Sequence, residues 1–318
     1  MSVLHWDANQ PEILDRLQNR SKFKICCKTL SEPDFIKSWI RHHSSIVGPE
    51  NLIVADNGST DAATLEVYDR LESAITVFQF SGSHNDIHWH PRFRPLFDCL
   101  KQTVDFFSFI DVDERLVWID QNSWSADRRI VDSLQDSGVI YPTTWLINAI
   151  GSISDFTLLD TEHRRILANN LRWGKPILPR ELIAAQPGIH NIQYAGSRFS
   201  RDGGNNLFLL HLTQFPEQRI AANVRKLVNR HLVDHSIDPM LIPAMDFSNH
   251  PDPTVLRFQR EIAEMIAYLN GDQSIPNKEH EFIKLGESGA VIYSNAEANK
   301  IFTKFIDDGS KIGAELFK

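Results

Sequence analysis

The sequence contains few of the residues that mark secreted, fibrous or membrane-spanning proteins. Only three of its 318 residues are cysteines, Cys26, Cys27 and Cys99, an odd number that does not suggest a disulfide framework. Glycine and proline number 15 each, too few for a low-complexity chain. No stretch approaches the roughly 18 uninterrupted apolar residues of a spanning helix, and no basic segment followed by an apolar run opens the chain. We therefore expect a globular, cytoplasmic protein, with peripheral membrane contact left open.

Positive charge is also in short supply. The chain has 33 Lys and Arg residues against 41 Asp and Glu residues, which leaves a formal net charge of −8. It therefore lacks the overall positive field with which proteins bind DNA or RNA non-specifically, and we expect no nucleic-acid partner. Any anionic ligand must be held by a local group of cations.

What the first half does contain is a regular alternation of short apolar runs and amphipathic segments. Strands are predicted over 23–27, 51–55, 75–80 and 106–110, with helical segments between them, and later strands over 139–145 and 207–212. Strands alternating with helices at this interval predict an α/β fold with a mainly parallel, Rossmann-like sheet flanked by helices. Ligands of such sheets bind at the carboxyl ends of the strands.

The C-terminal third has a different pattern. Apolar residues recur at helical spacing from Ile220 to Leu232 and from Val255 to Leu269. Between them, residues 234–253 contain four prolines and are predicted to be a linker or an ordered surface loop. The expected organisation is an α/β domain over 1–215 and a helical C-terminal extension over 216–318.

Two acidic clusters follow predicted strands directly. Asp111-Val112-Asp113 comes after the uniformly apolar run 106–110, and a second cluster spans Asp56 to Asp61. Carboxylates this close repel each other, and a divalent cation relieves the repulsion. Hard oxygen ligands suit Mg²⁺ or Mn²⁺, which commonly bridge to substrate phosphates. The simpler alternative is a pair of loop carboxylates that cap the sheet.

These two segments resemble motifs of a known enzyme class. Phe109-Ile110-Asp111-Val112-Asp113-Glu114 resembles the metal-binding D-x-D-E segment of glycosyltransferases with the GT-A fold, and Ala55 to Asp61 resembles their D-N-x-S-x-D turn. The pair is most similar to the family-2-like and family-92-like enzymes, over residues 23–211. The resemblance implies a nucleoside-diphosphate-sugar donor, a divalent metal (Mn²⁺ or Mg²⁺) and usually inversion at the sugar carbon.

The same resemblance assigns roles to single residues. Asp56 and Asp61 would contact the nucleoside, and Asp111 and Asp113 would serve the metal and the diphosphate. Lys175-Pro176-Ile177 and Gly188-Ile189-His190 resemble the family's K-x-I and G-x-H segments, which places Lys175 and His190 at the donor. Leu209-Leu210-His211 resembles a strand-ending H-Y, so His211 would be a further metal ligand.

The general base of an inverting transfer is left open. The segment from Trp145 to Arg165 departs from the family pattern, because residues 149–154 replace its usual core. Glu162, which aligns with the family glutamate, and Asp155 are the two candidates for the catalytic base. Each would serve equally well as a surface or helix-capping carboxylate.

Three other polar groups have open interpretations. The stretch from His163 to Arg180 contains five basic residues, suited to phosphate contact or to a solvated face. The basic helix over 217–232 suits a lipid surface, a lipid-diphosphate acceptor or plain solvent exposure. His88 and His90 would share one face of an extended segment, although no further zinc ligand is evident nearby.

The sequence thus favours a metal-dependent glycosyltransferase that acts on a glycan or glycolipid acceptor in polysaccharide or glycoconjugate assembly. Two alternatives remain. One is a degenerate GT-A domain that binds a glycan or a partner protein without turnover. The other is a metal-dependent nucleotidyltransferase or phosphohydrolase, since those enzymes also place paired carboxylates after a strand.

Overall fold

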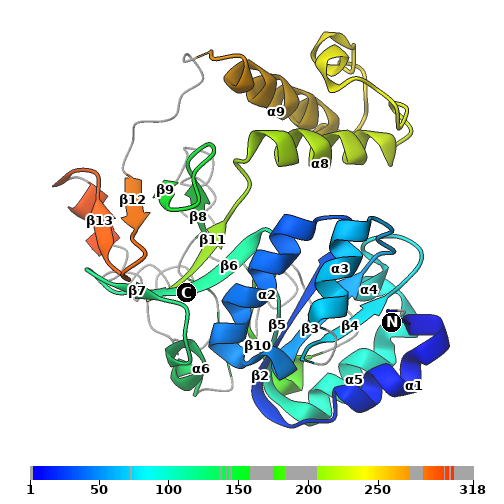
Figure 1. Ribbon diagram of the computed structural model, residues 1–318, viewed down its shortest axis with the longest axis vertical. Coiled ribbons are helices and arrows are strands. Elements are labelled where there is room, and N and C mark those ends of the chain that lie inside the picture. The colour runs from blue at the N-terminus through cyan, green and yellow to red at the C-terminus, as the bar shows by residue number, and fades with distance from the viewer. Residues whose placement is uncertain are drawn as a thin grey trace.

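The computed structural model describes residues 3–71, 74–135, 138–140, 142, 145–157, 175–183, 206–272, 282–296, 298–300 and 302–303. They form two β-sheets and a separate pair of packed helices, and the connection between β5 and β6 joins the two sheets (Figure 1). Short helical turns connect several elements: η1 (Pro49–Asn51), α4 (Asp86–Trp89), η2 (Pro91–Phe93) and η3 (Arg180–Leu182).

The first sheet is the predicted parallel one. Its strand order is β1–β4–β3–β2–β5–β10, formed by β1 (Leu4–His5), β2 (Ser21–Thr29), β3 (Leu52–Asp56), β4 (Thr76–Gln79), β5 (Val104–Phe109) and β10 (Leu178–Pro179). Every neighbouring pair is parallel except β5 and β10. The α/β class is therefore confirmed, and β2, β3 and β5 end at the same edge.

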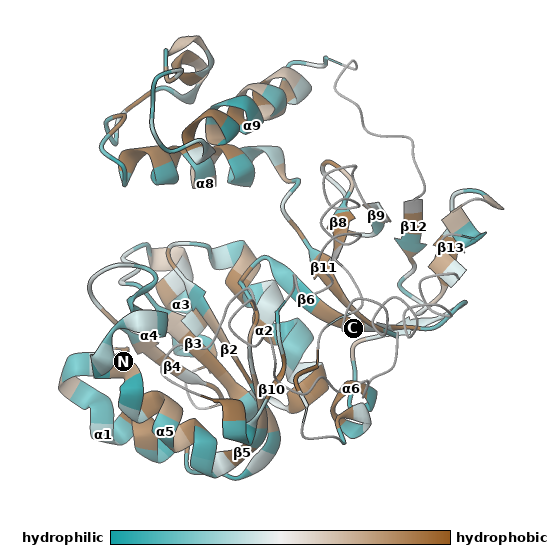
Figure 2. Ribbon diagram, turned by 180° about the vertical axis from the view of Figure 1, so that it is seen from behind, coloured by the Kyte–Doolittle hydropathy of each residue, from teal (hydrophilic) through white to brown (hydrophobic). Residues whose placement is uncertain are grey.

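Helices cover both faces of this sheet because successive strand residues point to opposite sides. Ile25 and Cys27 of β2 pack in one core with α2 (Pro33–Val47), α3 (Ala62–Leu71) and α6 (Arg129–Ser133). Cys26 points the other way, into a core shared with α1 (Trp6–Arg16) and α5 (Arg94–Thr103). The strands are accordingly hydrophobic on both sides, whereas hydrophilic residues line the outer faces of α1 and α5 (Figure 2). All three cysteines are buried and free.

The second sheet is mixed and was not anticipated. Its order is β13–β12–β9–β8–β11–β6–β7, formed by β6 (Glu114–Ile119), β7 (Trp124–Ser125), β8 (Trp145–Asn148), β9 (Asp155–Thr157), β11 (Leu207–His211), β12 (Phe282–Leu285) and β13 (Val291–Tyr293). Only β8 and β11 pair in parallel; the other neighbours are antiparallel. Since β6 follows the acidic motif directly, that motif lies where the chain passes from the first sheet to the second.

The strand predicted over 139–145 is seen only at its two ends, since residues 141, 143 and 144 lie outside the described residues. Strand β8 begins at Trp145, and Ile140 forms only an isolated antiparallel bridge with Ile177.

The extension over 216–318 is not helical throughout. Strands β12 and β13 return to the second sheet, where Ile283 and Leu285 are buried against Phe156 and Phe208. Two glycines, Gly286 and Gly289, lie in the turn between them, and Gly289 has a positive φ of 84°. Both strands consist mostly of apolar residues, but they are short, and they were not separated from the helical pattern before them. The boundary between 215 and 216 stays a prediction.

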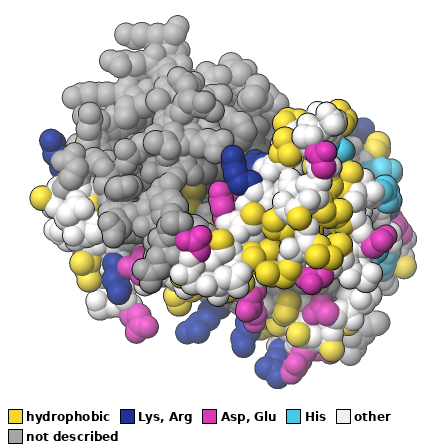
Figure 3. Space-filling model, turned by 90° about the horizontal axis from the view of Figure 1, so that it is seen from above, with side chains coloured by type: hydrophobic (Ala, Val, Ile, Leu, Met, Phe, Trp, Pro, Cys, Tyr) yellow, Lys and Arg dark blue, Asp and Glu magenta, His cyan; other side chains and the backbone are white. Residues whose placement is uncertain are grey.

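The helical part of the extension is a compact unit of α8 (Pro216–Val228), η6 (Pro239–Ala244) and α9 (Thr254–Leu269). Ile220, Leu227, Phe258 and Ile262 belong to its shared core. The predicted linker 234–253 is an ordered surface segment, because Ile242 of η6 is buried in that core. Hydrophobic side chains gather on the outer face of this unit (Figure 3). No helix among the described residues is long and apolar enough to cross a membrane.

Candidate functional site

The acidic motif forms the connection between β5 and β6. The Asp111 backbone N–H donates to Glu114 Oε2 at 2.8 Å, and Val112 is buried in the core beneath. The buried Val112 side chain thereby anchors the segment, and the two aspartates on either side of it lie at the carboxyl edge of the first sheet. This is the position that the strand-end argument predicted for them.

A buried lysine compensates part of this negative charge. Lys175 Nζ lies 2.5 Å from Asp111 Oδ2 and 3.6 Å from Glu114 Oε2, and the Lys175 side chain has no exposed surface. Burial lowers the pKa of Lys175, but the two carboxylates outweigh it and leave the pKa above its ordinary value. Burial raises the pKa of Glu114 to about 7. The Lys175 ammonium, expected at the donor, is thus engaged with the acidic motif from below.

A histidine partners the second aspartate. His211 ends β11, whose register with β6 pairs it with Glu114, and its Nε2 lies 3.5 Å from Asp113 Oδ2. Burial lowers the pKa of His211, but the Asp113 carboxylate outweighs this and raises it. Burial raises the pKa of Asp113, but the neighbouring His211 outweighs this and leaves the pKa below its ordinary value. The structure therefore brings together Asp113 and His211, two of the three predicted metal ligands, within ion-pair distance.

A cavity of about 940 Å³ opens above this motif, between the edge of the first sheet and the helical unit. The side formed by the sheet, here called the strand wall, comprises Lys28, Leu30, Glu32, Asn57, Gly82–Asn85 and Asp111–Asp113. The opposite side, the helix wall, comprises Arg219, Ala222, Arg225, Lys226, Val228–His231, His235 and Phe258. Its volume is ample for a nucleotide-sized ligand.

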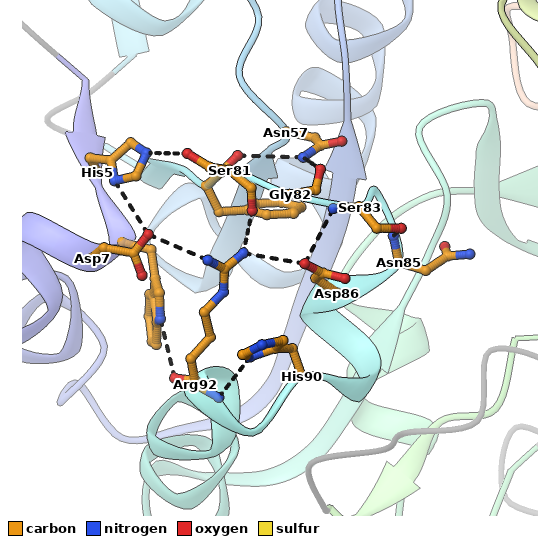
Figure 4. A network of polar contacts seen from close by, with 12 residues as sticks. His5, Asp7, Asn57, Ser81, Gly82, Ser83, Asn85, Asp86, His90 and Arg92 are labelled. Carbon is orange, nitrogen blue, oxygen red and sulfur yellow. Dashed lines mark hydrogen bonds and ion pairs between the residues drawn. The ribbon is translucent and has the colours of Figure 1, made fainter. Parts of the chain in front are cut away.

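The loop at the end of β4 is held in place by a polar network (Figure 4). Arg92 lies at its centre and donates to the Ser81 carbonyl oxygen and to Asp86 and Asp7, the last at 3.4 Å. Asn57 Nδ2 donates to the carbonyl oxygen of Gly82 at 3.1 Å. The N-terminal helix thereby fixes the loop segment Gly82–Asn85 that forms part of the strand wall.

The histidines of that loop do not form the predicted arrangement. The segment is the helical turn α4, so His88 and His90 do not share one face of a strand. His88 is buried with its ring 4.5 Å from that of Phe109, whereas His90 is exposed and accepts from the Arg92 N–H. Asn85 at the N-cap and Pro91 after the turn bound this short helix. The prediction of an extended segment did not take these two residues into account.

The turn after β3 is shaped by its own aspartates. Asp56 is fully buried, and its Oδ1 accepts from the backbone N–H of Ser59 at 2.9 Å and from the Ser59 hydroxyl at 2.7 Å. Asp61 Oδ1 accepts from the Thr64 N–H at 2.8 Å at the start of α3. Within this turn, Asn57 lines the cavity, whereas Asp56 and Asp61 do not. The nucleoside contacts of these two aspartates therefore stay predictions.

The base candidates lie in different parts of the chain. Asp155 is in β9, where its Oδ2 accepts from the hydroxyls of Ser152 at 2.7 Å and Ser154 at 3.1 Å, and it does not line the cavity. Glu162, His190 and the basic residues from His163 to Arg172 lie outside the described residues.

Sequence reasoning missed two strand-wall residues, Lys28 and Glu32. Lys28 is the penultimate residue of β2, is largely buried and donates to Asn85 Oδ1; burial lowers its pKa to about 8. Glu32 Oε1 accepts from Arg225 of α8 at 3.1 Å, and burial raises the Glu32 pKa. The strand-end rule that singled out Asp56 and Asp111 applies equally to β2 and would have found Lys28.

The donor atoms near Asp113 suit a divalent cation. Within the described ranges, no three His, Cys, Asp or Glu side chains surround one point. Asp113 Oδ2 and His211 Nε2 are close enough to bind one ion, and Mg²⁺ and Mn²⁺ sites commonly combine one or two protein ligands with water and substrate phosphates. The residues present therefore fit a metal that is completed by a diphosphate.

No protein-family model matches the chain, and no curated protein sequence is significantly similar to it. Solved structures similar to it include the mannosyltransferase PcManGT from Pyrobaculum calidifontis in complex with GDP-Man and Mn²⁺, at 12% identity over 98% of this chain and 95% of that chain, with a TM-score of 0.39. Residues 1–349 of S. aureus TarS in complex with UDP are 14% identical over 79% and 92%, with a TM-score of 0.30. Glucosyl-3-phosphoglycerate synthase from Mycobacterium tuberculosis in complex with phosphoglyceric acid is 15% identical over 82% and 84%, with a TM-score of 0.33. These similarities are distant, so a functional argument depends on the site itself.

Proposed function

We propose that this protein is a metal-dependent glycosyltransferase of the GT-A type, which transfers a sugar from a nucleoside-diphosphate sugar to a hydroxyl acceptor. The observation that carries the proposal is the Asp113 carboxylate, which is paired with His211 and lines a cavity that Lys28 and the Gly82–Asn85 loop also line. An anionic diphosphate and a divalent cation together match this combination of carboxylate, imidazole and ammonium groups.

Asp113 and His211 would hold the metal, with Asp111 beside them. A divalent cation supplies charge that stabilises the departing diphosphate. Lys175 keeps Asp111 and Glu114 compensated, so that the carboxylates of the motif stay close together without a cation. Lys28 presents a further positive charge to the phosphates from the end of β2.

In the proposed inverting reaction, the acceptor oxygen forms a bond to the anomeric carbon. The bond from that carbon to the diphosphate oxygen breaks, and the nucleoside diphosphate leaves with the electron pair. The hydroxyl proton passes to a carboxylate base. Glu162 stays our candidate for that base, whereas the Asp155 carboxylate is occupied by two serine hydroxyls.

We further propose a glycan or glycolipid acceptor, in polysaccharide or glycoconjugate assembly. The basic residues of the 217–232 helix were also a candidate for membrane contact. Arg219, Arg225 and Lys226 line the cavity in the structure, which favours a ligand rather than a bilayer as their partner.

The test is calorimetric titration of UDP and of GDP in the presence and absence of Mn²⁺. We expect one nucleotide to bind more tightly with Mn²⁺, and we expect Asp113→Asn to remove that gain while the metal-free affinity is kept or improved, because a carboxylate facing the diphosphate is gone. Asp98→Asn, an exposed carboxylate change on α5, is the matched control. Metal-independent nucleotide binding would instead favour a binding module without turnover.

Donor turnover provides the second readout. Release of the nucleoside diphosphate from UDP- and GDP-sugars should require Mn²⁺ and fall at least about 100-fold in Asp113→Asn, since that is the usual cost of removing one charge-stabilising group. Retained metal-dependent turnover in this variant would disprove the role of Asp113.

A further inference from the structure

The helix wall of the cavity is unusually rich in cations. Four of its residues carry positive charge, namely Arg219, Arg225, Lys226 and Arg230, and none of its residues is acidic. The whole protein has a net charge of −8, so this concentration is local. Cations gathered on one wall repel each other, and an anion between them relieves the repulsion.

Three of these cations already have partners behind or beside the wall. Arg219 Nη2 lies 2.7 Å from Glu261, Arg225 Nη2 lies 3.1 Å from Glu32, and Arg230 Nε lies 3.1 Å from Asp252. Their charge is largely compensated in the protein itself. They therefore shape the wall more than they attract a ligand.

Lys226 differs from its three neighbours. Across the described part of the chain, no carboxylate lies within ion-pair distance of its ammonium, which donates only to Asn223 Oδ1 at 3.1 Å. Nζ also lies 5.0 Å from the Phe258 ring centre, and burial lowers the Lys226 pKa to about 8. A partly buried ammonium without a counterion is energetically costly, and a bound anion offsets that cost.

The surroundings hold this ammonium in place. Phe258 of α9 is 4% exposed, and three cations lie over its ring: Lys226, Arg230 and Arg257, at 5.0, 5.0 and 5.4 Å. Such contacts orient the cations at the edge of the cavity without neutralising them. The helix wall is therefore organised before any ligand binds.

The cavity has a second cation of the same kind on its other side. Lys28 of the strand wall also has no carboxylate within ion-pair distance among the described residues, and its ammonium contacts Asn85. The acidic motif Asp111–Asp113 belongs to the same strand wall. Two ammonium groups on opposite walls, neither in an ion pair with a described residue, provide two separate positions for anionic groups.

We infer that the helix wall binds a phosphate group of the acceptor, with Lys226 as its main contact, while Lys28 serves the diphosphate of the donor. This rests on the proposed function, and it narrows the acceptor to a hydroxyl compound that carries a phosphate. The phosphate belongs either to a small soluble metabolite or to a lipid headgroup. The exposed side chains of Met240 and Leu241 in η6 make the lipid source worth a separate measurement.

The experiment uses the full chain with Mn²⁺ and whichever of UDP or GDP binds. Glycerol 3-phosphate is titrated into this complex by calorimetry, with glycerol as the control for the phosphate. Phosphatidylcholine vesicles with and without phosphatidic acid are tested by co-sedimentation. The variants are Lys226→Met, Lys28→Met and Lys226→Arg, and Lys101→Met on the exposed face of α5 is the matched control.

Lys226→Met should weaken phosphate-ligand binding at least about tenfold, the loss of one charge-assisted contact, with little change in nucleotide affinity. Lys28→Met should do the reverse, and Lys226→Arg and Lys101→Met should bind both ligands. Glycerol 3-phosphate binding identifies a soluble source, and binding only to phosphatidic acid vesicles identifies a lipid source.

Other outcomes overturn the inference. One is that neither glycerol 3-phosphate nor phosphatidic acid vesicles bind the protein. Another is that they bind Lys226→Met with the same affinity as the unchanged protein. A loss of nucleotide affinity in Lys226→Met that matches the loss in Lys28→Met would assign both lysines to the donor. The phosphate titration is repeated without nucleotide, so that a failure of nucleotide binding, which would contradict the proposed function, is seen separately.

Discussion

The two walls of the cavity achieve charge compensation in different ways. The strand wall places its carboxylates over a fully buried cation, Lys175, within the connection of two sheets. The helix wall belongs to a unit that packs mainly on itself. The contacts that link it to the start of α2 include the Glu32–Arg225 pair and the Phe35–Phe215 ring contact at 6.0 Å. The comparison indicates a firmly held strand wall, where we propose that the metal and the diphosphate bind, and a more weakly attached helix wall, where we propose that the second substrate binds.

The largest expected effect is on the rigid wall. Lys175→Met should lower the free energy of unfolding by about 3 kcal/mol or more, because Asp111 and Glu114 would lose their buried counter-charge. Urea unfolding monitored by circular dichroism measures it. Lys24→Met is the matched control, since Lys24 is equally buried but donates to the Asn19 carbonyl and the Ser21 hydroxyl rather than to a carboxylate. Equal losses of unfolding free energy in the two variants would mean that compensation of the carboxylates by Lys175 does not make the strand wall especially stable.

The next effect concerns pH. The folded-state pKa of Lys28 is lowered by burial to about 8, so its positive charge is lost as the pH rises through that value. Metal-free nucleotide affinity should therefore fall about tenfold when Lys28 is neutralised between pH 7 and pH 9. Calorimetry at both pH values checks this, with Lys28→Met expected to show a much smaller change. An equal change in the variant would assign the titration to another group.

The smallest effect tests the attachment of the helix wall. The Glu32–Arg225 pair is partly exposed, so its coupling energy should be about 1 kcal/mol or less. A double-mutant cycle with Glu32→Gln and Arg225→Gln, followed by urea unfolding, measures it directly. A coupling of several kcal/mol would mean that the helix wall is held as firmly as the strand wall.

Local pattern was sufficient for much of the fold. Strands β2 to β5 and helices α2, α8 and α9 were predicted close to their observed positions, because each buries a periodic apolar face. Strand β6 and the β12–β13 hairpin were missed. Both contain runs of apolar residues, but their place in the second sheet depends on pairing with β11 and β9, which are distant in the chain.

The site was predicted in part for the same reason. Asp111 and Asp113 could be placed at a strand end, because the strand before them is a local feature. The strand-end rule was applied only to acidic clusters, so Lys28, at the end of β2, was not considered. The direction of the α8 cations depends on how the helical unit sits over the sheet, which helical spacing does not specify.

The scarcity of cations in the sequence established by itself that an anionic ligand needs a local site, and strand-end position established where the carboxylates lie. Only the tertiary structure decided which charges meet. Lys175 reaches Asp111 through the β5–β10 pairing, and His211 reaches Asp113 through the β6–β11 register. Such contacts depend on packing between segments far apart in the chain, because a local pattern fixes the face of a strand but not its neighbour.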